Sequence, residues 1–120
     1  MYWWFKMIEK KHRLTKRKEF GYIYKKGEAK HTNNLTLLYT PTYLKTFKVG
    51  FSISKKVGKA YQRNLVKRRL REAFKTMMNN VDVKYNYVII AKPTILDQSY
   101  QNIKQELFQL FKKSGRIINE

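Results

Sequence analysis

An excess of positive charge constrains this chain more than any other feature of its sequence. Its 120 residues include 27 Lys and Arg against 8 Asp and Glu, which gives a formal net charge of +19 with histidine neutral. Like charges repel one another in a compact state, so a charge of this size is tolerated mainly when a polyanion supplies the opposite charge. We therefore expect nucleic acid to be the main partner.

The apolar residues are nonetheless numerous enough for a folded chain. Leu, Ile, Val and Phe make up about 27% of the sequence, above the roughly 20% below which highly charged chains remain disordered. A chain of 120 residues suits one domain. We expect a basic and aromatic extension over residues 1–12, with Met7 as a second candidate initiator beside Met1. A single RNA-binding domain is expected over residues 13–120.

Metal-binding and catalytic side chains are scarce. The absence of cysteine excludes disulfides, thiolate metal sites and a cysteine nucleophile. His12 and His31 have polar surroundings with no His or Asp at ligand spacing, so we expect surface histidines. A nuclease acting alone needs a general base and usually metal-holding carboxylates or a histidine pair, whereas the 8 acidic residues are scattered. We therefore expect no catalytic residue and no metal site in the protein.

The sequence also argues against membrane association and export. No apolar run approaches the roughly 18 residues of a membrane span. The aromatic residues 2–5 form a stretch shorter than the apolar region of about 7 residues in a signal peptide. We expect a cytoplasmic protein.

Helical spacing marks the first element. Phe20, Ile23 and Tyr24 fall at i, i+3 and i+4. Thr15 is a candidate N-cap, and Gly27 stands where a C-terminal glycine would end the helix. The spacing predicts a helix between these two residues, whose aromatic stripe either packs in the core or offers its rings to a ligand.

Three runs predict β-strands. Residues 35–40 and 49–54 alternate in the period of two that a strand requires. Residues 85–92 are rich in Tyr, Val and Ile on both faces, which suits a central strand covered on both sides. In the second run Ser52 and Ser54 share a nearly bare face, which either accommodates a packed helix or stays open for a ligand.

Two longer helices complete the pattern. The helix predicted over about residues 61–78 has a core stripe at helical spacing: Val66, Leu70, Ala73, Phe74 and Met77. The last helix begins after Asp97 or Ser99 and closes at Gly115. The predicted order is α-β-β-(β)-α-β-α, in which the bracketed element is a short strand before Val49. This order indicates an α+β fold, a single compact domain with a central sheet packed by helices.

The helix over residues 61–78 carries the strongest functional signal. One arc beside its core stripe, roughly 100° wide, holds Asn64, Lys67, Arg68, Arg71 and Lys75. From Lys55 to Lys75 the chain has nine Lys or Arg residues and a single acid, Glu72. A charged run is often only a solvated face, but no nearby acid balances this one, so we expect it to bind an anion.

The same region carries a family resemblance. Residues 49–60, VGFSISKKVGKA, are followed by Arg63-Asn64 and by residues 67–74, KRRLREAF. Together they resemble the signature of the bacterial ribonuclease P protein subunit. Supporting features run from residue 13 to the end of the chain: Arg13-Leu14, Glu19-Phe20, Tyr24, Gly27, YVIIA at residues 87–91 and the amphipathic last helix.

The resemblance implies a small basic protein that binds a catalytic RNA, the two together removing the 5′ leader from precursor tRNA. It implies that the RNA performs the phosphodiester hydrolysis, with Mg²⁺ bound mainly by the RNA. The implied partners are ribonuclease P RNA and precursor tRNA, with no obligatory protein partner. The family fold includes a left-handed β-α-β crossover, whereas the sequence pattern alone predicts the usual right hand.

The resemblance also assigns residues to two surfaces. The surface for the RNA subunit comprises Lys59, Arg63, Asn64, Lys67, Arg68 and Arg71. The cleft for the single-stranded leader comprises Phe20, Tyr24, Ser52, Ser54, Lys55, Ala91 and Lys92. Leu65 departs from the arginine common at its position; we expect it to be exposed, with Arg69 as a substitute contact. A cleft aromatic of the family matches Leu38, next to Tyr39, and a slip of one residue would exchange their faces.

Two other functions stay open on the residues alone. A ribosomal or general nucleic-acid-binding protein would bind unrelated RNAs with similar affinity and leave leader removal unchanged. A nuclease in its own right would cleave RNA without an RNA partner, and the scattered acidic residues argue against it.

Overall fold

The computed structural model describes residues 12–43 and 47–118, so the extension predicted over residues 1–12 lies outside the described residues apart from His12. The main elements are α1 (Arg17–Lys26), β1 (Glu28–His31), β2 (Leu35–Pro41), β3 (Val49–Ile53), α2 (Ala60–Lys75), β4 (Tyr85–Ala91) and α3 (Tyr100–Lys113). Short 3-10 helices are η3 (Lys55–Val57), η4 (Met78–Asn80) and η5 (Pro93–Asp97). The predicted order of helices and strands is confirmed, but the additional short strand is β1, which precedes β2 instead of lying directly before Val49.

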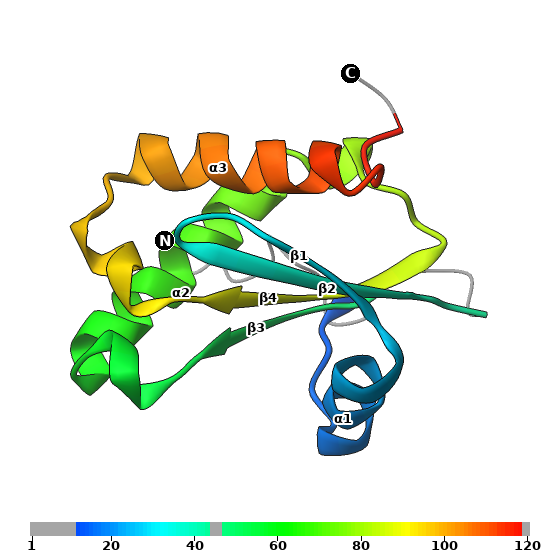
Figure 1. Cartoon of the computed structure of the whole chain (residues 1–120), viewed down its shortest axis with the longest axis horizontal. Helices are drawn as coiled ribbons and strands as arrows, with labels where there is room; N and C mark the ends of the chain where they lie inside the picture. The colour runs from blue at the N-terminus through cyan, green and yellow to red at the C-terminus, as the bar shows by residue number, and fades with distance from the viewer. Residues whose placement is uncertain (1–11, 44–46, 119–120) are drawn as a thin grey trace.

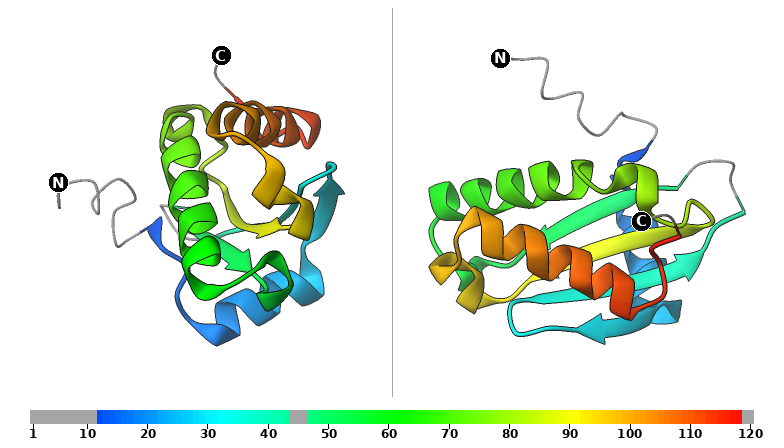
Figure 2. Two further views of the ribbon diagram at one scale, coloured as in Figure 1. Left: turned by 90° about the vertical axis from the view of Figure 1, so that its left-hand side faces the viewer. Right: turned by 90° about the horizontal axis from the view of Figure 1, so that it is seen from above.

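The strands form one mixed sheet in the order β1-β2-β4-β3 (Figure 1). β1 and β2 form an antiparallel hairpin, β4 runs antiparallel to β2, and β3 runs parallel to β4. In Figure 2 (right), α2 lies in front of the sheet; with the strands turned to point upward, β4 lies to the left of β3.

The β3-α2-β4 crossover is therefore left-handed, as the resemblance implied, and the right hand predicted from the pattern is wrong. Apolar periodicity reports which side chains are buried, but not on which side of β3 the next strand pairs. Here β4 pairs with β2 along its whole length and so lies between β2 and β3.

Helices lie on both faces of the sheet. α2 and α3 cover one face, which we call the core face, while α1 lies on the opposite face and covers only part of it (Figure 1). The core face carries the larger hydrophobic cluster, and this cluster includes the stripe predicted on α2: Val66, Leu70, Ala73, Phe74 and Met77. We call the opposite face the α1 face. β4 contributes Tyr87 and Ile89 to the core face and Val88 to the α1 face, which confirms a central strand covered on both sides.

The start of α1 differs from the prediction by one residue. Its N-cap is Lys16 rather than Thr15, because the Glu19 carboxylate accepts a hydrogen bond from the Lys16 backbone N–H at 3.4 Å. Gly27 ends the helix as predicted, although its φ of −76° is ordinary. Glycine is needed there for a close approach, since a Cβ would lie 2.6 Å from the Ile23 carbonyl oxygen.

The last helix begins and ends at signals visible in the sequence. The Ser99 hydroxyl accepts a hydrogen bond from the Asn102 backbone N–H at 3.1 Å, so Ser99 rather than Asp97 is the cap. Gly115 follows α3 in the left-handed region with φ +77°.

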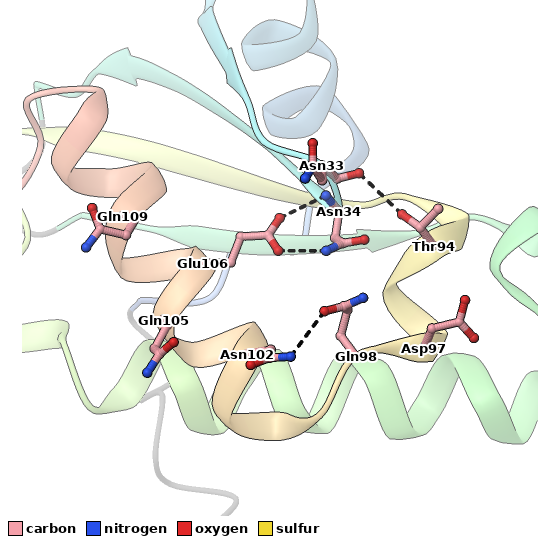
Figure 3. A pocket seen from close by; sticks show the side chains of 9 residues that line it. All are labelled: Asn33, Asn34, Thr94, Asp97, Gln98, Asn102, Gln105, Glu106 and Gln109. Carbon is pink, nitrogen blue, oxygen red and sulfur yellow. Dashed lines mark hydrogen bonds between the residues drawn. The ribbon is translucent and has the colours of Figure 1, made fainter.

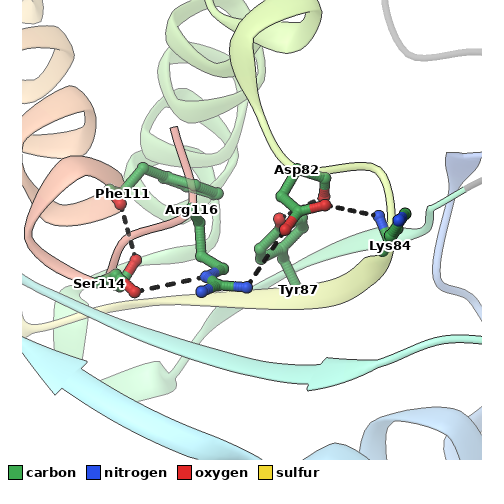
Figure 4. A network of polar contacts seen from close by, with 6 residues as sticks. All are labelled: Asp82, Lys84, Tyr87, Phe111, Ser114 and Arg116. Carbon is green, nitrogen blue, oxygen red and sulfur yellow. Dashed lines mark hydrogen bonds and ion pairs between the residues drawn. The ribbon is translucent and has the colours of Figure 1, made fainter. Parts of the chain in front are cut away.

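A polar network then ties the C-terminal segment to the start of β4 (Figure 4). Arg116 Nη1 donates to Asp82 Oδ2 at 3.2 Å, and its guanidinium carbon lies 4.1 Å from the centre of the Tyr85 ring. The Tyr87 hydroxyl donates to the Asp82 carbonyl oxygen at 2.5 Å. Burial raises the pKa of Tyr87 far above its ordinary value, so this hydroxyl remains a donor.

Candidate nucleic-acid interface

A groove of about 540 Å³ runs along the outer surface of α2. We call it the α2 groove; its lining residues are Tyr61, Asn64, Leu65, Lys67, Arg68 and Arg71. Four of the six residues predicted to bind the RNA subunit therefore lie together in one hollow, on the side of the helix away from Leu70 and the core. The helix period brings them together, because residues three and four apart are neighbours on a helix surface.

The electrostatics of this groove favour a bound anion. Burial and the nearby Arg71 lower the pKa of Lys67, and burial and the nearby Arg13 lower the pKa of Arg71. Within the described ranges, neither Lys67 nor Arg71 forms an ion pair with an acidic side chain. Cations held close together without acidic partners are stabilised when phosphates occupy the space between them.

Arg63 occupies a different position from the rest of the arc. Together with Ile53 and Ala60 it lines a smaller hollow of about 150 Å³, which Asn64 and Lys67 also line. Its Nε is buried and has no hydrogen-bond partner among the described residues. Asn64 and Lys67 thus connect the hollow at Arg63 with the α2 groove.

Lys59, Leu65 and Arg69 differ in how far they fit the predictions. Lys59 is exposed at the N-cap of α2, where its backbone N–H donates to Gln62 Oε1 at 2.8 Å, and it lines neither hollow. Leu65 is half-buried and lines the α2 groove, so the prediction that it is exposed is wrong. Arg69 is not among the groove residues.

Tyr61 and Arg13 were not predicted as site residues. Tyr61 follows the first residue of α2 and is 68% exposed in the α2 groove. Its place three and seven residues before Asn64 and Arg68 is a signal that could have found it. Arg13 pairs with Val49 beside β3 and lies near Arg71, a proximity that no local sequence pattern indicates.

The second predicted surface is the α1 face. Phe20 is half-buried against β3, where a Cβ on Gly50 would lie 2.5 Å from Phe20 Cζ. Tyr24 is 50% exposed, one helical turn further along α1. Ser52 pairs with Ile90 and is half-buried two residues beyond Gly50 on the same face, because side chains of a strand alternate.

The remaining predicted cleft residues lie near the ends of β3 and β4. Ser54 and Lys55 are exposed after β3. Lys92 Nζ donates to the Thr32 carbonyl oxygen at 2.6 Å, so this ammonium also holds the turn between β1 and β2. β3 and β4 end on the part of the sheet that α1 leaves uncovered (Figure 1).

Ala91 is the one predicted cleft residue that the structure moves to the other side. It is only 3% exposed and belongs to the core-face cluster, because it alternates with Val88 and Ile90 along β4. The same alternation settles the choice at β2. Leu38 belongs to the α1 face and Tyr39 to the core face, so no tyrosine of β2 lines the predicted cleft.

A third hollow contrasts with both basic surfaces. It has a volume of about 680 Å³ and lies between the turn after β1, η5 and α3 (Figure 3). Asn and Gln side chains dominate its lining, together with Thr94, Asp97 and Glu106, and no lining residue is Lys or Arg. Glu106 Oε1 accepts a hydrogen bond from Asn34 Nδ2 at 2.7 Å, so this carboxylate holds the turn in place. The positive charge of the molecule is therefore unevenly distributed.

Among residues 12–43 and 47–118, no group of three or more His, Asp or Glu side chains lies where it could hold a metal ion. No helix within the same ranges is long and apolar enough to cross a membrane.

Comparison with known proteins agrees with the geometry. Residues 8–115 match the family model described as Ribonuclease P. The chain is 34% identical over 110 residues to a ribonuclease P protein component from Bacillus cereus strain G9842, with 90% of this chain and 95% of that protein covered.

Solved structures show the same similarity. The RNase P protein of Staphylococcus aureus has a TM-score of 0.82 at 28% identity, covering 90% of this chain and 98% of that one. The RNase P protein of Thermotoga maritima, solved in complex with 1-(4-fluorophenyl)-2-thiourea, has a TM-score of 0.78 at 25% identity, covering 84% and 98%.

Proposed function

The chain belongs to the ribonuclease P protein family, and we propose that it serves this enzyme through two separate faces, the α2 groove for the catalytic RNA and the α1 face for the leader. As a ribonuclease P protein component it is a subunit of the holoenzyme that hydrolyses precursor tRNA at its 5′ end. Its partners are ribonuclease P RNA and the precursor tRNA.

The observation that carries the first assignment is the cation cluster of the α2 groove. Lys67, Arg68 and Arg71 line one hollow, where burial and, after it, repulsion from Arg71 lower the pKa of Lys67. A phosphate backbone placed in the groove would relieve this repulsion, and Arg forks can hold two phosphate oxygens. Arg63, whose buried Nε has no hydrogen-bond partner among the residues that the structure describes, supplies a further donor at the end of the groove near β3.

The second assignment rests on the half-open α1 face. Tyr24 offers an exposed ring at the edge of α1, and Ser52 provides a small, polar floor on β3. Exposed Lys55 lies at the end of that strand. An aromatic ring beside lysines suits unpaired nucleotides of any sequence, as a leader requires.

The chemistry itself is assigned to the RNA. The phosphodiester hydrolysis takes place in the RNA subunit, which also holds most of the Mg²⁺, and the protein supplies binding and charge neutralisation in the cytoplasm. The protein alone should therefore leave precursor tRNA intact.

The test is precursor tRNA cleavage at low Mg²⁺ with the RNA subunit alone, the protein alone, and both together. Efficient cleavage is expected only from the two together. Cleavage by the protein alone would contradict the assignment of the chemistry. Equal affinity for unrelated RNAs, with no effect on cleavage, would instead favour a general RNA-binding protein.

A further inference from the structure

One wall of the α2 groove is apolar, and phosphate binding does not explain it. Tyr61 and Leu65 form this wall, while Asn64, Lys67, Arg68 and Arg71 provide the polar remainder. We propose that the wall is a stacking platform for one unpaired base of the catalytic RNA, with Tyr61 as the residue that holds it. This inference rests on the proposed function and assigns to Tyr61 a role distinct from that of the cations.

The geometry of α2 places the two apolar side chains together. Tyr61 and Leu65 are four residues apart, so they are neighbours on the helix surface. Arg68 lies one further turn along and lines the same hollow. A ring, an aliphatic side chain and a guanidinium thus follow one another along the groove.

The Tyr61 ring is left available by the rest of the fold. It is 68% exposed, and no aromatic or cation-π partner for it exists within the part of the chain that the structure describes. Burial in the core therefore does not account for a large aromatic side chain at this position. Stacking against a planar ligand would cover its exposed face.

The surrounding charge decides which planar ligand fits. Lys67, Arg68 and Arg71 line the same hollow, so a ligand must bring negative charge together with an apolar surface. An unpaired nucleotide does both, because its base stacks while its phosphate contacts the cations. The exposed Asn64 amide can both donate to and accept from the edge of a base.

The test is the affinity of the full-length protein for ribonuclease P RNA, measured at a series of salt concentrations. Tyr61→Ala should weaken binding by on the order of tenfold at every salt concentration, because stacking involves no counterion release. Tyr61→Phe should retain the affinity, whereas Tyr61→Leu should behave like Tyr61→Ala. Arg68→Ala is the contrasting variant, since loss of a phosphate contact should reduce the salt slope by about one.

Three results would overturn the proposal. These are an unchanged affinity of Tyr61→Ala, a fall in its salt slope like that of Arg68→Ala, or full affinity of Tyr61→Leu. Because Tyr61 is exposed, circular dichroism should show an intact fold for each variant. Failure of the wild-type protein to prefer ribonuclease P RNA over unrelated RNA would overturn the proposed function as well. This preference is measured with the wild-type protein alone, so the two failures can be distinguished.

Discussion

Tyrosines on the two flanks of α1 meet different surroundings. Tyr24 and Tyr22 are 50% and 55% exposed, and Ile23 between them is buried against the sheet. Tyr22 lines a shallow groove with Thr40 and Pro41, on the flank away from Phe20. Of the two tyrosines, only Tyr24 lies one helical turn from Phe20.

With Tyr24→Ala, the holoenzyme should lose part of its preference for precursor over mature tRNA, because a stacked base is worth about 1–3 kcal/mol and mature tRNA has no leader to place there. Affinity for the RNA subunit should stay unchanged. Binding of both tRNAs by wild-type and variant holoenzymes measures the ratio, with Tyr22→Ala as the matched control. An unchanged ratio would exclude Tyr24 as a leader contact.

Gly50 sets how closely α1 approaches the sheet. A Cβ at this position would lie 2.5 Å from Phe20 Cζ and 3.1 Å from Leu14 Cβ. Gly50→Ala should therefore push the Phe20 ring outward and destabilise the fold by about 1–3 kcal/mol, as overpacked cores do. Urea unfolding measures this. If Gly50→Ala is as stable as wild type, the contact between Phe20 and β3 is looser than the structure has it.

At the scale of elements, α2 separates its stability from its binding surface. Leu70 is fully buried on the core face, whereas Lys67 and Arg71 line the groove on the other side. Arg63→Ala, Lys67→Ala and Arg71→Ala combined should weaken holoenzyme assembly while the free energy of unfolding is kept. Leu70→Ala should instead destabilise the protein by roughly 2–5 kcal/mol. Gel-shift titrations and denaturant unfolding of both variants provide the comparison, and normal assembly of the triple variant would mean that the RNA surface lies elsewhere.

Features that depend on local sequence could be predicted, whereas features that depend on tertiary packing could not. The stripe of α2, the apolar residues on both faces of β4 and the cap at Ser99 are local signals, and the structure confirms them. β1 was not located because a strand of four exposed residues carries no apolar pattern. The face of Ala91 and the proximity of Arg13 to Arg71 depend on register and tertiary packing, which a single sequence does not record.

At the scale of the whole molecule, the +19 charge governs association with RNA. The amide-rich hollow between η5 and α3 has no lysine or arginine in its lining, so the charge gathers elsewhere on the surface. Phosphates neutralised by the protein release their counterions, and log affinity should fall linearly with log salt. The protein should also lower the Mg²⁺ concentration that the RNA subunit needs. Titrations from low to physiological salt test this, and a flat plot would contradict the electrostatic account.

The position of β3 has a consequence for how the holoenzyme responds to the length of a leader. Its alternating side chains send Phe51 and Ile53 toward α2, and Gly50 and Ser52 toward α1, so β3 and the body of α2 together separate the two proposed RNA surfaces. Because the thickness of these two elements is fixed, we expect the protein to set a fixed distance between the cleavage site and the leader nucleotides that it binds. In a series of shortened leaders, we expect the contribution of the protein to affinity to vanish abruptly at one length, whatever the sequence. A gradual decline across the series would mean that the protein contacts the leader at many positions rather than at one site.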